Sequence, residues 1–305
     1  MWPAFLTALC FAGSGICGQR SAVSFGSLRG NTFRLALSAV ALGLLALLLG
    51  PIPLHSETAR RFLYSGLVGF GVGDVALFLA YPRLGSRLTL LVNLCCAPFA
   101  GALGDWLLLG MPTAASQWFP TGLILSGVAL ALAGGGLWRD PALGRRHAFS
   151  GLAAAVMAGV GQGVGASLSR YAKTAAVAEG VRLYGINEAF LRSLPGLAFS
   201  AGLWWLAGRW AGRSTASAPV VERNSSLYRR RWWWLLGAAG FGPIVGVSCF
   251  QWALGLAPSS LVLSITATTP ILVMPLAVWA EGDRPGPLAI VGALIAVCGV
   301  VLLLH

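Results

Sequence analysis

Two carboxylates stand inside strongly apolar segments of the chain, where an ionisable side chain is costly and therefore informative. Asp74 lies near the middle of residues 62–81, and Asp105 lies nearer the end of residues 88–109. A charge at the centre of a membrane costs at least ~2.5 kcal/mol, so such groups usually face a protein interior or water. We therefore predict a proton-coupling role for Asp74, with a hydrogen bond to a neighbouring helix as the structural alternative. For Asp105 we favour structural capping.

Neutral polar and aromatic side chains in such segments could bind a solute by hydrogen bonding or stacking. The predicted lining consists of Asn93, Gln162, Gln251, Phe78, Tyr81, Phe250 and Trp252. The structural alternative for the amides is bonding between helices, worth about 0.6 kcal/mol each. For the aromatic side chains it is packing against the core or lipid. The set predicts a candidate cavity rather than a role for any single member.

Two arginines and two prolines occupy comparable places in the two halves of the chain. Arg34 and Arg192 are predicted at span entrances, either as anchors reaching the membrane surface or as groups that attract an anionic solute. Pro98 and Pro270 lack the N–H that a helix interior uses, so both predict kinks that could serve gating. The threonines just before Pro270 are expected to support its kink.

Composition places these residues in a membrane. The chain has 305 residues, of which 57% are hydrophobic and 10% charged, against about 25% charged in a soluble domain. Ten segments are apolar on all sides, and most reach the roughly 17–25 residues needed to cross a bilayer. They are 3–18, 33–50, 62–81, 88–109, 119–138, 149–169, 189–208, 232–255, 260–280 and 286–304.

Motifs for catalysis or metal binding are weak. The six cysteines lie in apolar segments without a CxxC pair, and the three histidines lie in loops or at the terminus. We therefore expect no metal, no cofactor and no enzymatic activity. Gly71-Val72-Gly73-Asp74 matches the GxGD of intramembrane aspartyl proteases, but that chemistry needs a second carboxylate in the same site. The protease is the least favoured alternative.

The chain also repeats itself at a constant offset of 172 residues without gaps. Residues 87–130 lie over 259–302, and Pro98 then falls on Pro270. Five spans in each half force the two copies to enter a membrane in opposite senses, as in many secondary transporters. The predicted fold is an all-α polytopic membrane protein with ten transmembrane helices in two inverted five-helix repeats. The repeats are 1–138 and 149–305, joined by a linker at 139–148.

These features resemble the EamA-type family of the drug/metabolite transporter superfamily over nearly the whole chain. The resemblance is clearest in Ala257-Pro258-Ser259-Ser260, Thr269-Pro270, Ala280-Glu281-Gly282, and the pair Gly292 and Gly299. The resemblance implies ten helices in two inverted repeats and transport of a small solute, most often outward. It also implies a central cavity lined mainly by the first, third and fourth helices of each half.

One departure from the family concerns an acidic residue at the end of the fourth helix of each repeat. It appears here as Glu281 in the second half, where we class it as an entrance charge. At the offset of 172 its partner is Leu109, so the first half lacks it. Asp105 lies one helical turn earlier on the same face. We suggest that Asp105 stands in for the missing acid.

The predicted function is a secondary-active exporter of a small metabolite, such as an amino acid or related solute, by alternating access with proton coupling as an option. A flippase for a lipid or lipid-linked sugar on the same scaffold is the alternative from another class. Expected partners are the solute and membrane lipids, without nucleic acid, in a monomer or homodimer. We expect a multi-pass protein of a bacterial inner (plasma) membrane.

The loop charges leave the orientation open. The net charge is +12, and the 15 Arg and Lys residues after odd-numbered spans outnumber the 6 after even-numbered spans. The positive-inside rule then puts both termini outside, whereas the family pattern puts them in the cytoplasm. A C-terminal reporter active only in the cytoplasm would separate the two.

Overall fold

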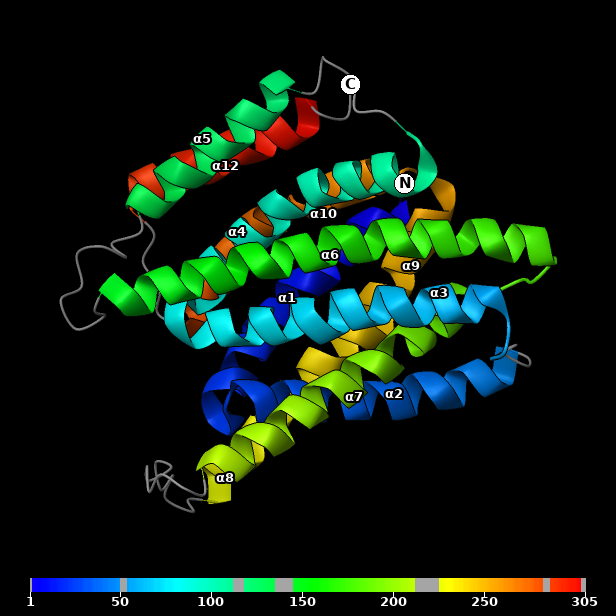
Figure 1. Ribbon diagram of the computed structural model, residues 1–305. Helices are drawn as coiled ribbons and strands as arrows, with labels where there is room; N and C mark the ends of the chain where they lie inside the picture. Colours follow the sequence, from blue (N-terminus) through cyan, green and yellow to red (C-terminus); the bar gives the residue numbers. More distant parts are fainter. Residues whose placement is uncertain are drawn as a thin grey trace.

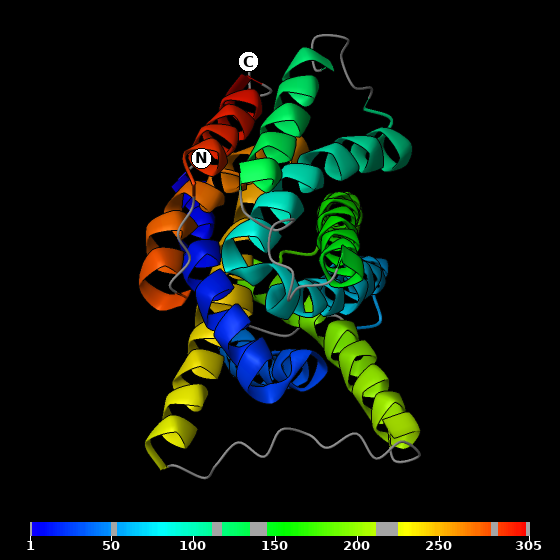
Figure 2. The ribbon, with the colours of Figure 1, turned by 90° about the vertical axis from the view of Figure 1, so that its left-hand side faces the viewer.

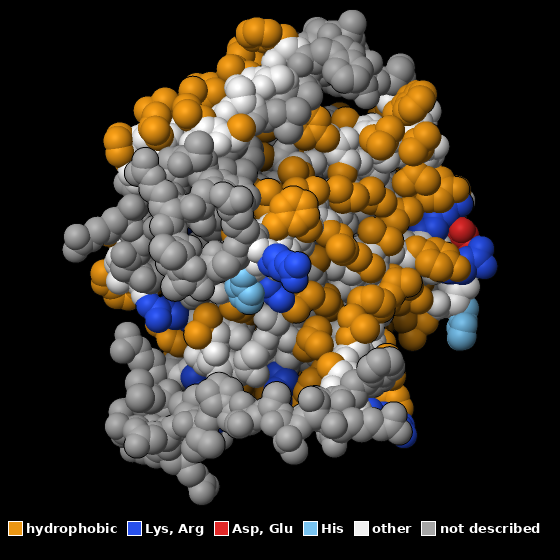
Figure 3. All heavy atoms as spheres, turned by 60° about the vertical axis from the view of Figure 1, so that its left-hand side comes forward, with side chains coloured by type: hydrophobic (Ala, Val, Ile, Leu, Met, Phe, Trp, Pro, Cys, Tyr) orange, Lys and Arg blue, Asp and Glu red, His pale blue; other side chains and the backbone are white. Residues whose placement is uncertain are grey.

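The computed structural model describes residues 2–49, 54–111, 118–134, 145–211, 225–281 and 286–302. Every regular element in these ranges is a helix, and the helices form one bundle of long, crossing rods (Figure 1). Apolar side chains cover much of the face shown in Figure 3, with arginine and lysine confined to a few places. An apolar exterior of this kind is what a lipid environment favours.

The first half contains five α-helices and one π-helical stretch. They are α1 (Trp2–Phe25), α2 (Ser27–Leu49), α3 (Glu57–Gly66), η1 (Leu67–Gly73), α4 (Asp74–Leu109) and α5 (Trp118–Gly134). The α4 segment is interrupted at Gly85, where the backbone leaves helical geometry with a φ of 74°. That left-handed conformation is open to glycine without a Cβ clash, so the chain turns there between the predicted spans 62–81 and 88–109.

The second half follows the same order. It contains α6 (Arg145–Glu179), α7 (Gly185–Ala211), α8 (Ser225–Ala239), η3 (Gly240–Gly246), α9 (Val247–Leu256), α10 (Ser259–Thr266), α11 (Thr269–Glu281) and α12 (Pro287–Leu302). Its π-helical stretch also has seven residues, and Ala257 breaks the chain between α9 and α10 with φ −154° and ψ 161°. Ala257 is the residue that the offset of 172 places over Gly85.

Within the part of the chain that the structure describes, five helical stretches are long and apolar enough to cross a membrane. They are Ser27–Leu49, Glu57–Leu109, Arg146–Glu179, Arg231–Leu256 and Ser259–Ala280, with Pro287–Gly299 as a shorter apolar helix. Glu57–Leu109 covers 53 residues and contains the turn at Gly85, so it covers two of the predicted spans. The all-helical membrane fold is thereby confirmed, whereas the count of ten crossings stays a prediction.

Helices of the two halves pack against each other throughout the bundle. The main pairs are α4 with α6, α2 with α7, α1 with α8, and α5 with α12. The pair α5 and α12 stands beside the rest of the bundle, at the top of Figures 1 and 2. Because each pair joins one helix from each half, the interior between them is built by both halves.

The two predicted kinks differ. In the second half the helix breaks at Ala267–Thr268, just before Pro270, and the Thr268 hydroxyl donates to the Ile265 carbonyl over 2.7 Å. Thr266 and Thr269 donate likewise within this turn. In the first half, α4 passes through Pro98 in helical geometry, and its break lies at Gly85 instead.

Candidate functional site

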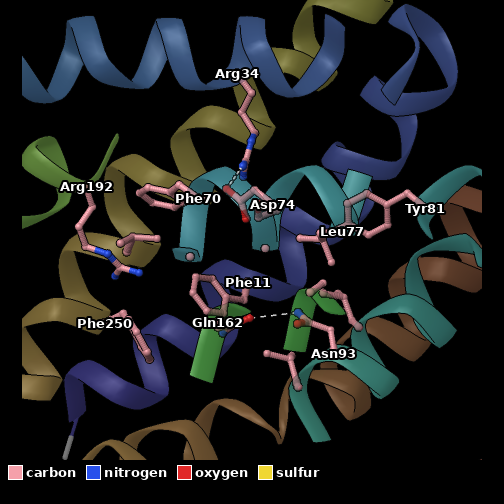
Figure 4. A pocket seen from close by; sticks show the side chains of 18 residues that line it. Phe11, Arg34, Phe70, Asp74, Leu77, Tyr81, Asn93, Gln162, Arg192 and Phe250 are labelled. Carbon is pink, nitrogen blue, oxygen red and sulfur yellow. Dashed lines mark hydrogen bonds and ion pairs between the residues drawn. The ribbon is translucent and has the colours of Figure 1, made fainter. Parts of the chain in front are cut away.

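A pocket lies at the centre of the bundle, between the halves. It encloses about 650 Å³ of space between atoms, part of it open to solvent. Its walls come from α1, α2, η1 and α4 of the first half and from α6, α7, η3 and α9 of the second. Figure 4 shows Arg34 and Asp74 on one side of the pocket and Asn93 and Gln162 on the other, with aromatic and aliphatic side chains around them.

Arg34 and Asp74 form an ion pair on one wall of this pocket. Arg34 Nη2 donates to Asp74 Oδ2 and, over 3.0 Å, to Asn31 Oδ1. The two side chains are 5% and 15% exposed. The Arg34 guanidinium also lies 4.8 Å from the centre of the Phe78 ring, a distance typical of cation–π attraction. Asp74 is therefore a buried, partnered carboxylate at the edge of a cavity.

Arg192 lies on the other side of the pocket and forms no direct ion pair among the described residues, while Asp74 and Glu188 attract it from a longer distance. Only 3% of the residue is exposed, and its guanidinium carbon lies 5.2 Å from the centre of the Phe70 ring. Its Nε and Nη1 have no hydrogen-bond partner among the residues that the structure describes. The acid one turn earlier on α7, Glu188, is held by Lys173 through both carboxylate oxygens.

The sequence predicted that both arginines lie at span entrances, and the structure places each of them in the lining of the pocket. Each is the eighth residue of its helix, α2 or α7, and each lines the central pocket. Hydropathy alone does not reveal such a place, because a charged residue near the border of an apolar segment lowers the local average and looks like part of a loop. Their shared place in the two helices was the available signal.

Two of the predicted amides meet across the halves. Asn93 Nδ2 on α4 donates to Gln162 Oε1 on α6 over 3.0 Å, and both residues line the pocket. Asn93 Oδ1 has no partner within the described part of the chain. Gln251 is fully buried and instead donates to Ser169 over 3.0 Å, away from the pocket lining.

Some of the aromatic candidates line the pocket and others do not. Tyr81 and Phe250 line the pocket, and Phe78 lies behind Tyr81 with its ring centre 5.5 Å away. Trp252 is 46% exposed and packs edge-on against Trp2 at 4.6 Å, outside the pocket lining. Phe11 of α1, which the sequence analysis did not select, lines the pocket; an isolated phenylalanine in an apolar helix carries no distinguishing pattern.

Asp105 does not reach the pocket. Its Oδ2 accepts from Arg170 Nη1 over 2.7 Å and from the Ser259 hydroxyl over 2.6 Å. It also accepts from the Ser259 backbone N–H at the start of α10, over 3.3 Å. This geometry matches the structural alternative, because a carboxylate at a helix start satisfies a free N–H and favours the positive helix end. Glu281 ends α11, and its side chain lies outside the described residues.

The pocket thus holds two guanidinium groups and one carboxylate inside an apolar bundle. Buried charges attract much more strongly than charges in water because the surrounding dielectric is low. Asp74 is the single carboxylate among the pocket's lining residues. The aspartyl protease arrangement, which shares one proton between two close acids, is therefore not present in the lining.

Comparison with known proteins identifies the family. The sequence matches the EamA-like transporter family over residues 1–133 and 150–305. A comparison with curated proteins gave no match. One solved crystal structure aligns over 98% of this chain and 87% of its own, with 19% identity and a TM-score of 0.45. With both segments matched and an apolar helical bundle around a polar pocket, the chain is a multi-pass integral membrane protein that belongs to the EamA-like transporter family of the drug/metabolite transporter superfamily.

Proposed function

We propose that this protein is a secondary transporter that exports a small metabolite by alternating access, with the central pocket as the solute site. The observation that carries the proposal is a pocket lined by both halves of an apolar bundle, with charged and amide side chains among its mostly apolar lining residues. A site between two repeats can be exposed to either side when one half rocks against the other. Hydrogen bonding by Asn93 and Gln162 and stacking on Phe250 suit a small solute such as an amino acid or related metabolite.

The proposed architecture is ten spans in two inverted repeats, 1–138 and 149–305, joined by 139–148. The order of the described elements supports it. Each half has a π-helical stretch of seven residues, η1 or η3, and each breaks soon afterwards, at Gly85 or Ala257. π-Helical turns are rare and frequently occur at functional sites, so their recurrence in the same order favours duplication over chance.

Asp74 is the proposed proton-coupling group. Its partner Arg34 comes from another helix, α2, so protonation of the carboxylate would weaken a contact between two elements of the pocket wall. Loss of the proton would restore the ion pair. A group of this kind links proton binding to the relative position of two helices, which is what a coupled transporter requires.

The test is flux in proteoliposomes under an imposed proton gradient. Wild-type protein should accumulate solute against its concentration gradient, and a protonophore should abolish the accumulation. Asp74→Asn should retain downhill exchange but lose proton-driven accumulation. The matched control is Glu57→Gln, because among the described residues the ion pairs of Glu57 are with Arg60 and Arg61 of its own helix, outside the pocket lining. Full proton-driven flux in Asp74→Asn would remove the coupling role.

The same vesicles separate a metabolite transporter from a lipid flippase. An apolar groove of the bundle surface runs between α4 and α6, from Cys96 to Leu168, and shares no lining residue with the central pocket. A flippase needs its head-group site to open sideways to lipid, so this separation favours a soluble solute. Scrambling of labelled lipids that depended on Asp74, without solute flux, would reverse that assignment.

A further inference from the structure

We infer that the transported solute carries one carboxylate on an apolar or aromatic body, and that Arg192 binds this carboxylate. The inference rests on the proposed function, because it names the chemical class of solute that the central pocket takes. Arg192 is 3% exposed, lines the pocket, and leaves Nε and Nη1 without a partner among the described residues. A buried cation without a partner is costly unless something pairs with it.

The residue that directly follows the π-helical stretch differs in charge between the two halves, and this difference bears on Arg192. In the first half, Asp74 directly follows the π-helical stretch η1 and pairs with Arg34. In the second half, Val247 directly follows η3, and it lines the same pocket. Each half therefore contributes an arginine to the pocket lining, but only the first half contributes an acid to it. A carboxylate brought by the solute would supply the missing charge.

The surroundings of Arg192 leave space for its guanidinium group. A Cβ added to Gly69 would lie 2.6 Å from Arg192 Nη2, and one added to Gly165 would lie 3.3 Å away. A side chain at position 69 would displace the guanidinium, whereas one at position 165 would first meet the backbone of Gly69, 3.1 Å away. In Figure 4 the guanidinium ends in the space between Phe70, Phe250 and Gln162, whereas Arg34 points at Asp74.

The charge balance favours a single negative charge. Glu188, the other acid near Arg192, has both oxygens on Lys173. Asp74 balances Arg34, so Arg192 leaves the lining with one positive charge in excess. One carboxylate neutralises it and matches the paired N–H groups of a guanidinium. The body of such a solute would contact Phe11, Leu77 and Phe250, which are apolar.

The experiment compares acids with their neutral amides in binding to the purified, detergent-solubilised protein. Phenylacetate and phenylacetamide are the first pair, and acetate and indole-3-acetate extend the series to smaller and larger bodies. We expect each aromatic acid to bind roughly 10- to 100-fold more tightly than its amide, the range typical of hydrogen bonds to a charged group. Phenyl phosphate is the comparator for a doubly charged anion.

Variants then assign the preference to Arg192. Arg192→Gln should lower the affinity for phenylacetate to that for phenylacetamide, and Arg192→Lys should fall between, because lysine keeps the charge but loses the planar fork. Unchanged binding of the amide to Arg192→Gln checks that the pocket is still folded. Arg60→Gln is the control, since Arg60 is 65% exposed and pairs with Glu57 on the same helix. Equal affinity for acid and amide, tighter binding of phenyl phosphate, or no binding of any acid would overturn the inference.

Flux measurements keep this inference distinct from the proposed function. Transport of neutral solutes that Arg192→Gln leaves unchanged would refute carboxylate recognition and leave the transporter intact. Carboxylate binding that depends on Arg192, without flux of any bound acid, would refute export and leave the binding site intact.

Discussion

The two halves of the bundle present the same framework with different charges. Arg34 in α2 and Arg192 in α7 hold the same place in their helices, and each lies near a π-helical stretch that borders the pocket. In the first half, Asp74 follows the π-helical stretch and forms an ion pair with Arg34. In the second half, the residue that follows the π-helical stretch is the uncharged Val247. In the function that we propose, the first half thus binds the proton and the second half binds the anionic solute.

The largest effect is expected from separating the pair in the first half. Arg34→Leu leaves Asp74 in a buried wall without its cation, which typically costs about 3–5 kcal/mol of folding free energy. Arg34→Leu combined with Asp74→Leu should cost less than Arg34→Leu alone, because Asp74 is then no longer left as a buried charge without its cation. Thermal unfolding in detergent measures both. A double variant as unstable as the sum of the single variants would show that the two residues do not stabilise each other.

A smaller effect is expected from giving the second half the acid that it lacks. Val247→Asp places a carboxylate in the wall of the pocket that Arg192 also lines, and we expect this carboxylate to attract Arg192 and compete with an acidic solute. Phenylacetate affinity should fall about tenfold or more, the equivalent of ~1.4 kcal/mol. Val247→Asn has nearly the same shape without the charge and should bind phenylacetate almost as the wild type does. Isothermal titration of both variants decides whether charge or shape matters.

The smallest effect is expected from crowding the free guanidinium. Gly69→Ala adds a methyl group 2.6 Å from Arg192 Nη2, so the arginine must shift. Overpacking of this kind costs about 1–3 kcal/mol, and we expect a roughly fivefold loss of phenylacetate affinity with less change for phenylacetamide. Gly202→Ala is the matched control, since nothing lies within 4 Å of its added Cβ. Equal losses for acid and amide would mean that the methyl group narrows the pocket without acting on Arg192.

Much of the membrane character and several pocket residues, among them Asp74, Asn93 and Gln162, could be predicted from the sequence. A carboxylate surrounded by apolar residues must find a partner or water, so Asp74 was identifiable without coordinates. The same argument applied equally to Asp105. In the structure, however, Asp105 pairs with Arg170, accepts a hydrogen bond from Ser259 and lies outside the pocket lining. Asp74 and Asp105 have the same cost of insertion into a membrane. Only the helices that pack around each acid decide which of the two lines the pocket.

Trp252 and Gln251 also show that the sequence does not reveal which residues of a helix face the pocket. They are sequence neighbours on α9, and both were candidates for the lining. Trp252 is 46% exposed beside Trp2, and Gln251 is buried against α6. In a helix that is apolar all round, the sequence carries no amphipathic stripe from which to read the inward face. Rotation about the helix axis is therefore set by packing.

The sequence by itself determined the apolar helical class, the family, and the existence of two similar halves, because hydropathy, glycine and proline spacing are local properties of the chain. Tertiary structure alone decided that Arg34 and Arg192 face a shared pocket and that only one of them meets an acid. Arg34 and Asp74 are separated by 40 positions and lie on different helices, so their pairing depends on how the helices cross. Charge balance in a buried site is a property of that three-dimensional arrangement.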